Sequence, residues 1–231
     1  MSIIQENIVT IFKNIKETDT PFYRNVEAIL QRIKEGASKD LITRIRSIDN
    51  KGKRNDLKKE LPSICFSGKF NKRSDVALQE HSGLICLDFD GYSTKKSLLA
   101  DKNKFIKNKY VYSVFVSPSG KGLKVLVKIP RDPKNHTGYF LALEKYFKSE
   151  FFDKTTKNIS RVCYESYDNN IHVNEKAQEW TKVEEVEYKE IIRNQGIKTI
   201  PITEESKITS YLVKWWTKNY PMVDGQRNNN A

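Results

Sequence analysis

The sequence lacks a long apolar segment. Nowhere in its 231 residues does a window approach the roughly 18 consecutive apolar residues of a membrane span. The first residues, MSIIQENIVTIFKNIKE, are interrupted by Gln5, Glu6 and Asn7 and have no small-residue cleavage site. These absences exclude a transmembrane helix and a secretory signal peptide. We therefore expect a cytoplasmic protein without a membrane partner.

Cysteine is also scarce, and its spacing is not that of a metal site. Cys65, Cys86 and Cys163 all lie in apolar runs, and no CxxC pair is present. This pattern predicts buried free thiols and argues against a disulfide framework and a zinc site. The three histidines show neither metal-ligand spacing nor a neighbouring nucleophile. Covalent catalysis by serine or cysteine therefore has no support.

Acidic residues are outnumbered, 29 against 41 Lys and Arg, which gives a net charge of +12. Eight of these charges come from residues 32–73, where thirteen basic residues face five acidic ones. Such a concentration suits a polyanion, because nucleic acid offers many phosphates. The alternative is a solvated face of surface helices. The residues predicted to contact nucleic acid are Arg44, Arg46, Lys53, Arg54, Lys69, Lys72 and Arg73.

The remaining pattern predicts a folded α/β (α+β) protein. Hydrophobic residues make up 38% of the chain and aromatic residues 11%, enough for a sizeable core. Short apolar runs alternate with helical stretches, without an internal repeat. The expected strands are 7–14, 63–68, 83–91, 110–117, 123–129 and 161–166. The expected helices are one ending at Gly36, one capped by Ser38, and the segments 93–107, 136–150 and about 211–216.

Two carboxylates end the most apolar segment, GLICLDFDG at residues 83–91. This run predicts a strand buried on both faces in the middle of a sheet. Residues two apart on a strand project to the same face, so Asp88 and Asp90 are expected side by side. A divalent cation held by oxygen ligands, Mg²⁺ or Mn²⁺, would relieve their repulsion. The alternative is structural, since Asp90-Gly91 is also a common turn pair.

A glycine-containing turn joins the next two expected strands. In SPSGKGLK, residues 117–124, glycines permit close backbone approach, serines offer hydroxyl groups, and lysines add positive charge. These features suit a triphosphate, although the spacing is not that of a Walker A loop and an ordinary hairpin turn is the alternative. The candidate nucleotide-binding residues are Ser117, Ser119, Gly120, Lys121, Gly122 and Lys124.

A third candidate segment is FFDKTTKNISR, residues 151–161. Asp153 follows two aromatic residues and offers a further carboxylate. Arg161 begins an apolar run and offers a further phosphate ligand. The alternatives are an ordinary loop residue for Asp153 and a surface ion pair for Arg161.

The order of these segments resembles the archaeo-eukaryotic primase superfamily, the primase-polymerases, and within it the VirE N-terminal-like modules of plasmids, phages and other mobile elements. ICLDFD resembles the first motif, VSPSGKGLK the second and FFD the third, while SRVCYESYD resembles the stretch after the third motif. The likeness spans about residues 61–168.

The resemblance implies an RRM-like antiparallel sheet with flanking helices, joined to an N-terminal α/β unit with the active site in the cleft between them. The implied catalytic domain is 1–180, with its two units at about 1–80 and 81–180. Residues 181–231 would be an acidic linker and a helix leading to a further domain, such as a helicase.

The resemblance also implies roles for single residues. Asp88, Asp90 and Asp153 would hold two divalent ions, Mg²⁺ or Mn²⁺, without an organic cofactor. Ser119, Lys121 and Lys124 would contact the phosphates of the incoming nucleotide, and Arg161 would orient it. Lys124 departs from the histidine that many members carry at this position.

The function expected from these features is DNA-dependent nucleotidyl transfer. An NTP or dNTP would be added to a 3′-hydroxyl on a single-stranded DNA template, in the replication of a plasmid, phage or mobile element. One alternative is an inactive single-stranded nucleic-acid-binding module of the same fold. Others are a metal-dependent nuclease and a nucleotide-sugar transferase, and the basic stripe argues against the transferase.

Overall fold

The computed structural model describes residues 7–185 and 212–215. By its internal contacts the chain divides into a unit ending at Glu187 and a second beginning at Tyr188. Of the expected C-terminal helix, residues 212–215 are helical, while Tyr211 and Trp216 lie outside the described residues. Most of the expected acidic linker also lies outside them. No described helix combines the length and apolarity needed to cross a membrane.

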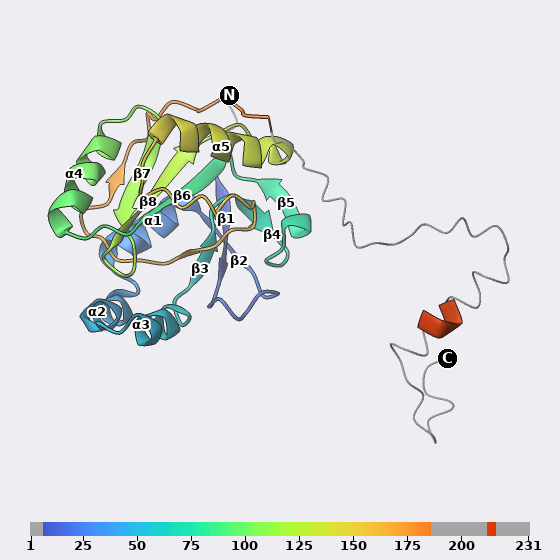
Figure 1. Cartoon of the computed structure of the whole chain (residues 1–231), viewed down its shortest axis with the longest axis horizontal. Coiled ribbons are helices and arrows are strands. Elements are labelled where there is room, and N and C mark those ends of the chain that lie inside the picture. The colour runs from blue at the N-terminus through green and yellow to red at the C-terminus, as the bar shows by residue number, and fades with distance from the viewer. Residues whose placement is uncertain (1–6, 186–211, 216–231) are drawn as a thin grey trace, which may run out of the picture. The chain divides into compact units, whose positions relative to one another are not determined.

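The longest apolar run forms a strand of an antiparallel sheet (Figure 1). Its neighbour is the second strand of the hairpin made by SPSGKGLK. In order across the sheet, the strands are β10 (His172–Val173), β7 (Val111–Val116), β8 (Gly122–Lys128) and β6 (Leu84–Asp90). Beyond β6, a single antiparallel bridge joins Phe89 to Phe152. The chain order β6, α4, β7, β8, α5 and then this bridge is that of a split β-α-β fold.

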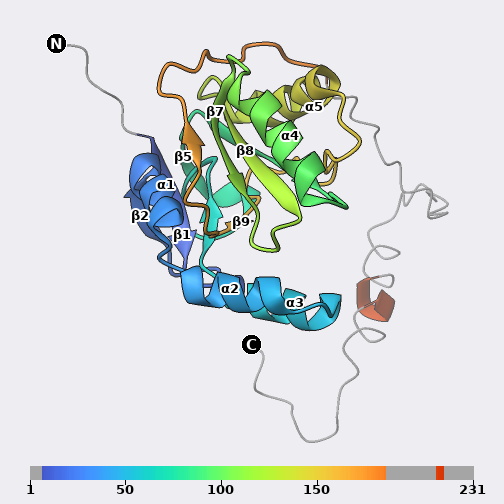
Figure 2. The same cartoon turned by 90° about the vertical axis from the view of Figure 1, so that its left-hand side faces the viewer.

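Helices α4 (Lys95–Ile106) and α5 (His136–Phe147) cover one face of this sheet (Figure 2). Strand alternation turns Leu87 and Phe89 toward them, into a core that also contains Phe140 and Phe152. The opposite face is covered as well, because Leu84 and Leu126 pack against α1 (Val26–Glu35). Burial on both faces explains why this strand is almost wholly apolar.

The N-terminal elements form a second antiparallel sheet. Its strands, in order, are β2 (Phe22–Asn25), β1 (Ile8–Phe12), β3 (Ser63–Cys65) and β9 (Cys163–Tyr164). A separate ribbon pairs β4 (Gly68–Phe70) with β5 (Leu78–His81). Because β9 comes from residues 163–164 and the two sheets share a core, the two units expected at 1–80 and 81–180 are not separated along the chain.

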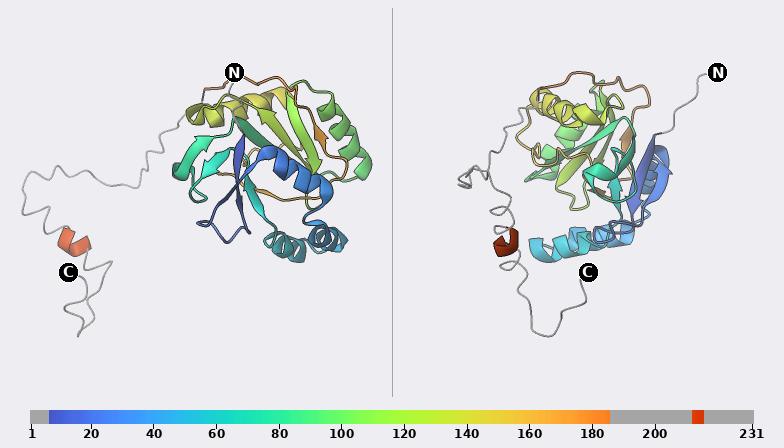
Figure 3. Two further views of the ribbon diagram at one scale, coloured as in Figure 1. Left: turned by 180° about the vertical axis from the view of Figure 1, so that it is seen from behind. Right: turned by 90° about the vertical axis from the view of Figure 1, so that its right-hand side faces the viewer.

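Helices α2 (Lys39–Ser47) and α3 (Lys51–Lys58) lie side by side at one end of the unit (Figure 3). We call them the α2–α3 pair. A small cluster of Ile42, Ile45 and Leu61 anchors α2, whereas α3 buries no residue of its own. The pair is therefore held by much less apolar packing than the central sheet.

The α+β class with an antiparallel sheet and flanking helices is confirmed, and several local expectations were wrong. The strand expected at 161–166 is paired only at 163–164, and β6 has a full neighbour on one side only. Ser38 precedes α2, but its hydroxyl donates to the buried Glu165 instead of capping the helix. The pattern missed α3 because KGKRNDLK has no apolar periodicity. The strand expected at 63–68 ends at Cys65, because residues 66–67 form a turn before β4, and the pattern missed β4 and the short strands β2, β5 and β10.

Candidate metal and nucleotide site

Asp88 and Asp90 lie at the end of β6 on the sheet face opposite to Leu87 and Phe89, as strand alternation predicts. In the antiparallel register, Asp88 stands opposite Lys124 and Asp90 opposite Gly122. Asp88 is buried, while Asp90 keeps exposed surface at the strand end. The two carboxylates therefore share one site.

Asp153 reaches the same site through the bridge beside β6. The backbone N–H of Asp153 donates to the carbonyl of Asp88 at 2.8 Å, and the N–H of Asp90 donates to the carbonyl of Phe151 at 2.8 Å. Phe152, which lies between Phe151 and Asp153 in sequence, makes an edge-on contact with Phe89, with ring centroids 5.2 Å apart. The aromatic pair before Asp153 thus fixes its position against β6.

The three predicted acids converge. Asp88, Asp90 and Asp153 each place one carboxylate oxygen within 4.8 Å of the others. Oδ1 of Asp88 is buried and has no hydrogen-bond partner among the described residues. An unsatisfied buried carboxylate oxygen is costly. A cluster of carboxylate oxygens suits a hard divalent cation such as Mg²⁺ or Mn²⁺, so these residues fit the expected metal.

The protonation of the cluster reflects its crowding. Partial burial of the Asp90 carboxylate, together with the charge of Asp88, raises the pKa of Asp90. Burial would also raise the pKa of Asp153, but hydrogen bonds from the backbone and hydroxyl of Thr155 lower it below its ordinary value. Asp153 is therefore held ionised, whereas a cation would strengthen ionisation of Asp90.

Lys124 lies within this cluster. Its Nζ forms an ion pair with Oδ2 of Asp88 across the β6–β8 ladder. Burial alone would lower the pKa of the Lys124 ammonium, but the charge of Asp88 reverses the effect and raises it. Arg161 borders the same small cavity as Asp88 and Lys124, and its charge helps to lower the pKa of Asp153. The structure therefore brings Arg161 to the site, as predicted.

The 117–122 loop is a tight turn next to the carboxylates. Gly120 adopts a positive φ of 73°, and its N–H donates to the carbonyl of Ser117 at 2.9 Å. The hydroxyl oxygens of Ser117 and Ser119 lie 3.2 Å apart, and Lys121 is exposed. A β-carbon on Gly122 would lie 2.1 Å from Oδ1 of Asp90. Glycine at this position therefore makes room for the second carboxylate.

Sequence reasoning missed one lysine of the site. Burial lowers the pKa of Lys58, which ends α3, and the charge of Asp90 partly opposes this effect. The charges of Lys124 and Arg54 also act on Lys58. Lys58 of the α2–α3 pair is therefore near enough to Asp90 for their charges to interact. In the sequence, Lys58 is only one of the thirteen basic residues of 32–73. Its helix was not predicted, because it has no apolar stripe.

The predicted nucleic-acid contacts do not all lie on helices. Arg44 and Lys53 are exposed on the α2–α3 pair. Lys69 lies on β4, and Lys72 and Arg73 follow it in a bend. Two further arginines are engaged with backbone carbonyls, Arg54 with Ile48 and Arg46 with Ser117, Pro118 and Tyr167.

All three cysteines are free thiols, as predicted. Cys65 and Cys163 are buried and Cys86 is half-buried. Contact with the Cys163 thiol, together with burial, raises the pKa of the Cys86 thiol. Both thiols border the small cavity beside Asp88. The Cys86 thiol is therefore protonated at neutral pH.

The model of one protein family matches residues 56–172, slightly more than half of the chain. The family is described as BT4734-like, N-terminal domain, and the chain belongs to it. The match includes all three carboxylates, the 117–122 loop and Lys58. No curated protein and no solved structure matches the chain significantly.

Proposed function

We propose that this member of the BT4734-like N-terminal domain family is a nucleotidyltransferase, and specifically a DNA primase-polymerase module. The observation that supports the proposal is the convergence of Asp88, Asp90 and Asp153 on one point, with a buried Asp88 oxygen unpartnered among the described residues. A glycine-containing loop and several cations border the same point. Transfer of a nucleotide requires an anionic metal-holding centre beside groups that bind phosphate.

Each side chain has a role in this proposal. Asp88, Asp90 and Asp153 would hold Mg²⁺ or Mn²⁺, which when bound activates the 3′-hydroxyl and neutralises the leaving pyrophosphate. Lys124 would exchange its pairing with Asp88 for a phosphate oxygen, because its long side chain is flexible. Lys121, exposed on the loop, and Arg161 would contact further phosphate oxygens. Ser119 would position the loop on the nucleotide.

The α2–α3 pair would hold the template strand. Its exposed residues Arg44 and Lys53 would contact phosphates, without reading base sequence. Lys58, whose pKa is influenced by the charge of Asp90, would lie between the bound strand and the reaction centre. The family resemblance of the motifs supports a role for this reaction in the replication of a plasmid, phage or mobile element, together with a helicase. The substrates would be an NTP or dNTP.

Incorporation of a labelled nucleotide on a primed single-stranded template tests the proposal. We expect wild type to incorporate nucleotide with Mg²⁺ or Mn²⁺. In Asp88→Asn, which keeps the side-chain shape but removes the charge, the rate of incorporation should fall by at least about 1,000-fold. Asp19→Asn, an exposed carboxylate in an N-terminal loop, is the matched control. If neither Mg²⁺ nor Mn²⁺ supports incorporation, the proposal is wrong. Degradation of the template by wild type but not by Asp88→Asn would instead assign a nuclease.

A second candidate is a strand-binding module without catalysis. The observation that favours it is the ion pair between Lys124 and Asp88, which already neutralises one carboxylate. In this case single-stranded DNA would bind with a steep salt dependence, and Asp88→Asn and Asp90→Asn would bind as wild type does. The incorporation assay separates the two candidates.

A further inference from the structure

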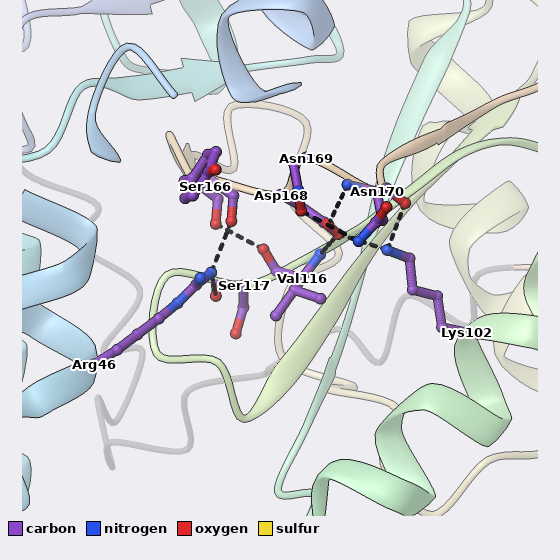
Figure 4. Close-up of polar contacts among 9 residues, drawn as sticks. Arg46, Lys102, Val116, Ser117, Ser166, Asp168, Asn169 and Asn170 are labelled. Carbon is purple, nitrogen blue, oxygen red and sulfur yellow. Dashed lines mark hydrogen bonds and ion pairs between the residues drawn. The ribbon is translucent and has the colours of Figure 1, made fainter. Parts of the chain in front are cut away.

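Arg46 differs from Arg54 of the α2–α3 pair because its guanidinium donates to backbone carbonyls far from the pair in sequence, whereas Arg54 donates to Ile48 (Figure 4). Its Nη2 donates to the carbonyls of Ser117 at 3.2 Å and Tyr167 at 2.9 Å, and its Nε donates to Pro118 at 3.3 Å. Arg46 also packs over Gly120, where an added β-carbon would lie 3.6 Å from Nε. One side chain thus joins α2 to the 117–122 loop.

The strand that leads into the loop is held rigidly at its end. Val116, the last residue of β7, donates its N–H to Asp168 at 2.8 Å and accepts from the Ser166 hydroxyl at 2.6 Å. Asp168 in turn forms a buried ion pair with Lys102 at 2.6 Å (Figure 4). These contacts fix where the strand ends. Arg46 joins the next two residues, Ser117 and Pro118, to α2 through their carbonyls.

The helix that carries Arg46 is the less firmly anchored partner. Only Ile42 and Ile45 of α2 are buried, and α3 buries none of its residues. A region with few buried apolar contacts has low local stability and responds to a ligand that binds it. The loop also borders a cavity of about 480 Å³ lined in part by Arg46, Gly120 and Lys121, which leaves room for it to shift.

We propose that Arg46 is a positioning residue that couples strand binding on the α2–α3 pair to nucleotide binding on the 117–122 loop. The inference rests on the proposed function and adds a regulatory step to it. Nucleic acid that orders the pair would fix Arg46 and, through the carbonyls of Ser117 and Pro118, the loop. By thermodynamic reciprocity, bound nucleotide must then strengthen strand binding by the same factor.

A binding cycle tests the coupling without any catalytic step. Calorimetry would measure the affinity of the full chain for an α,β-imido nucleotide with Mn²⁺, in the presence and absence of a primed single-stranded oligodeoxynucleotide. We expect the oligodeoxynucleotide to tighten nucleotide binding by about tenfold in wild type. In Arg46→Ala the two affinities should become equal. Arg46→Lys should restore coupling only in part, because one ammonium cannot span three carbonyls.

Arg44→Ala is the matched control, since it removes a cation from the same helical turn without a contact to the loop. It should weaken strand binding yet keep the tenfold coupling. Thermal unfolding of each variant tests whether it is folded. If Arg46→Ala does not fold, Arg46→Lys takes its place as the test of coupling. In steady state, Arg46→Lys should raise KM for nucleotide several-fold at saturating template, with kcat nearly unchanged.

The outcomes separate this inference from the proposed function. Wild type that incorporates nucleotide but binds it equally with and without DNA overturns the coupling and leaves the transfer reaction standing. Wild type that shows the coupling but never incorporates nucleotide overturns the reaction and leaves the coupling standing. An Arg46→Lys variant with full wild-type coupling also overturns the role of Arg46. Wild type that binds no nucleotide overturns both.

Discussion

The central sheet and the α2–α3 pair differ in both charge and packing. The sheet is covered on both faces and presents carboxylates at the end of β6, whose Leu87 and Phe89 are buried in the core. The pair presents cations and is anchored by a small cluster around Ile42 and Ile45. A metal centre needs fixed ligands, whereas a strand-binding surface tolerates movement. The chain divides these two demands between its two regions.

The largest expected effect comes from disturbing the acidic end of the sheet. In Gly122→Ala the new methyl group would fall 2.1 Å from Oδ1 of Asp90 and 2.7 Å from the carbonyl of Phe89, so Asp90 must move. We expect nucleotide incorporation to fall by roughly 100-fold or more, because misplaced catalytic groups lose this much. Gly52→Ala, in α3, is the control and should leave activity within about twofold. If Gly122→Ala incorporates nucleotide at the wild-type rate, Asp90 has no role in the reaction.

A second test concerns the stability of the sheet. Lys102 and Asp168 form a buried ion pair, and Asp168 also accepts from the backbone of Val116. Lys102→Ala leaves a buried carboxylate without its cation, and we expect a loss of about 3–5 kcal/mol in the free energy of unfolding in urea. Lys59→Ala, which breaks the exposed pair with Asp56 on the α2–α3 pair, should change the unfolding midpoint little. Equal effects would contradict the contrast between the regions.

A third test uses pH. The N–H of Gly83 donates to Nδ1 of His81, so Nε2 of His81 carries the hydrogen and donates to Nδ1 of His136 at 3.1 Å. Burial lowers the pKa of His81 to about 4 and that of His136 to about 3. The charge of Arg131 further lowers the pKa of His81, and Asp132 opposes it; Asp75 likewise opposes the lowering at His136.

Both histidines therefore stay neutral in the folded state while the unfolded chain takes up protons below about pH 6.5. Their contribution to stability is complete above that pH and declines as the pH falls toward the folded-state values. Between about pH 6 and 5 we expect the free energy of unfolding to fall by up to roughly 1.4 kcal/mol per pH unit for each histidine. In His136→Asn the slope should be about half. An unchanged slope would mean that the pair is not buried and neutral.

The smallest expected effect concerns the exposed cations of the α2–α3 pair. Lys53→Ala should weaken binding of single-stranded DNA a few-fold and reduce the slope of log K against log salt by about 0.7, the release of one counterion. Lys134→Ala, an exposed lysine in the short helix Pro133–Asn135 outside the α2–α3 pair, should leave the slope unchanged. Equal slopes in the two variants would place the strand elsewhere.

Much of the fold was predictable where one physical signal dominates. Apolar runs marked β6, β7 and β8, and helical spacing with a terminal Gly36 marked α1, whose Gly36 indeed adopts a positive φ of 85°. Prediction failed where side chains give no periodic signal. The polar helix α3 is an example, and so is Ser38, whose hydroxyl found the buried Glu165 instead of the helix backbone. Such choices depend on partners more than 100 residues away in sequence.

The sequence by itself determined that Asp88 and Asp90 share a face, because strand alternation is a local property of the backbone. It also determined a basic stretch and a glycine turn. Only the tertiary structure decided that Asp153 joins the two acids, through the contact of Phe152 with Phe89, and that Lys124 pairs with Asp88. Only the tertiary structure also shows that Arg46 of α2 contacts the carbonyls of Ser117 and Tyr167. Long-range packing made these choices, since local periodicity does not specify which distant side chain fills a given position.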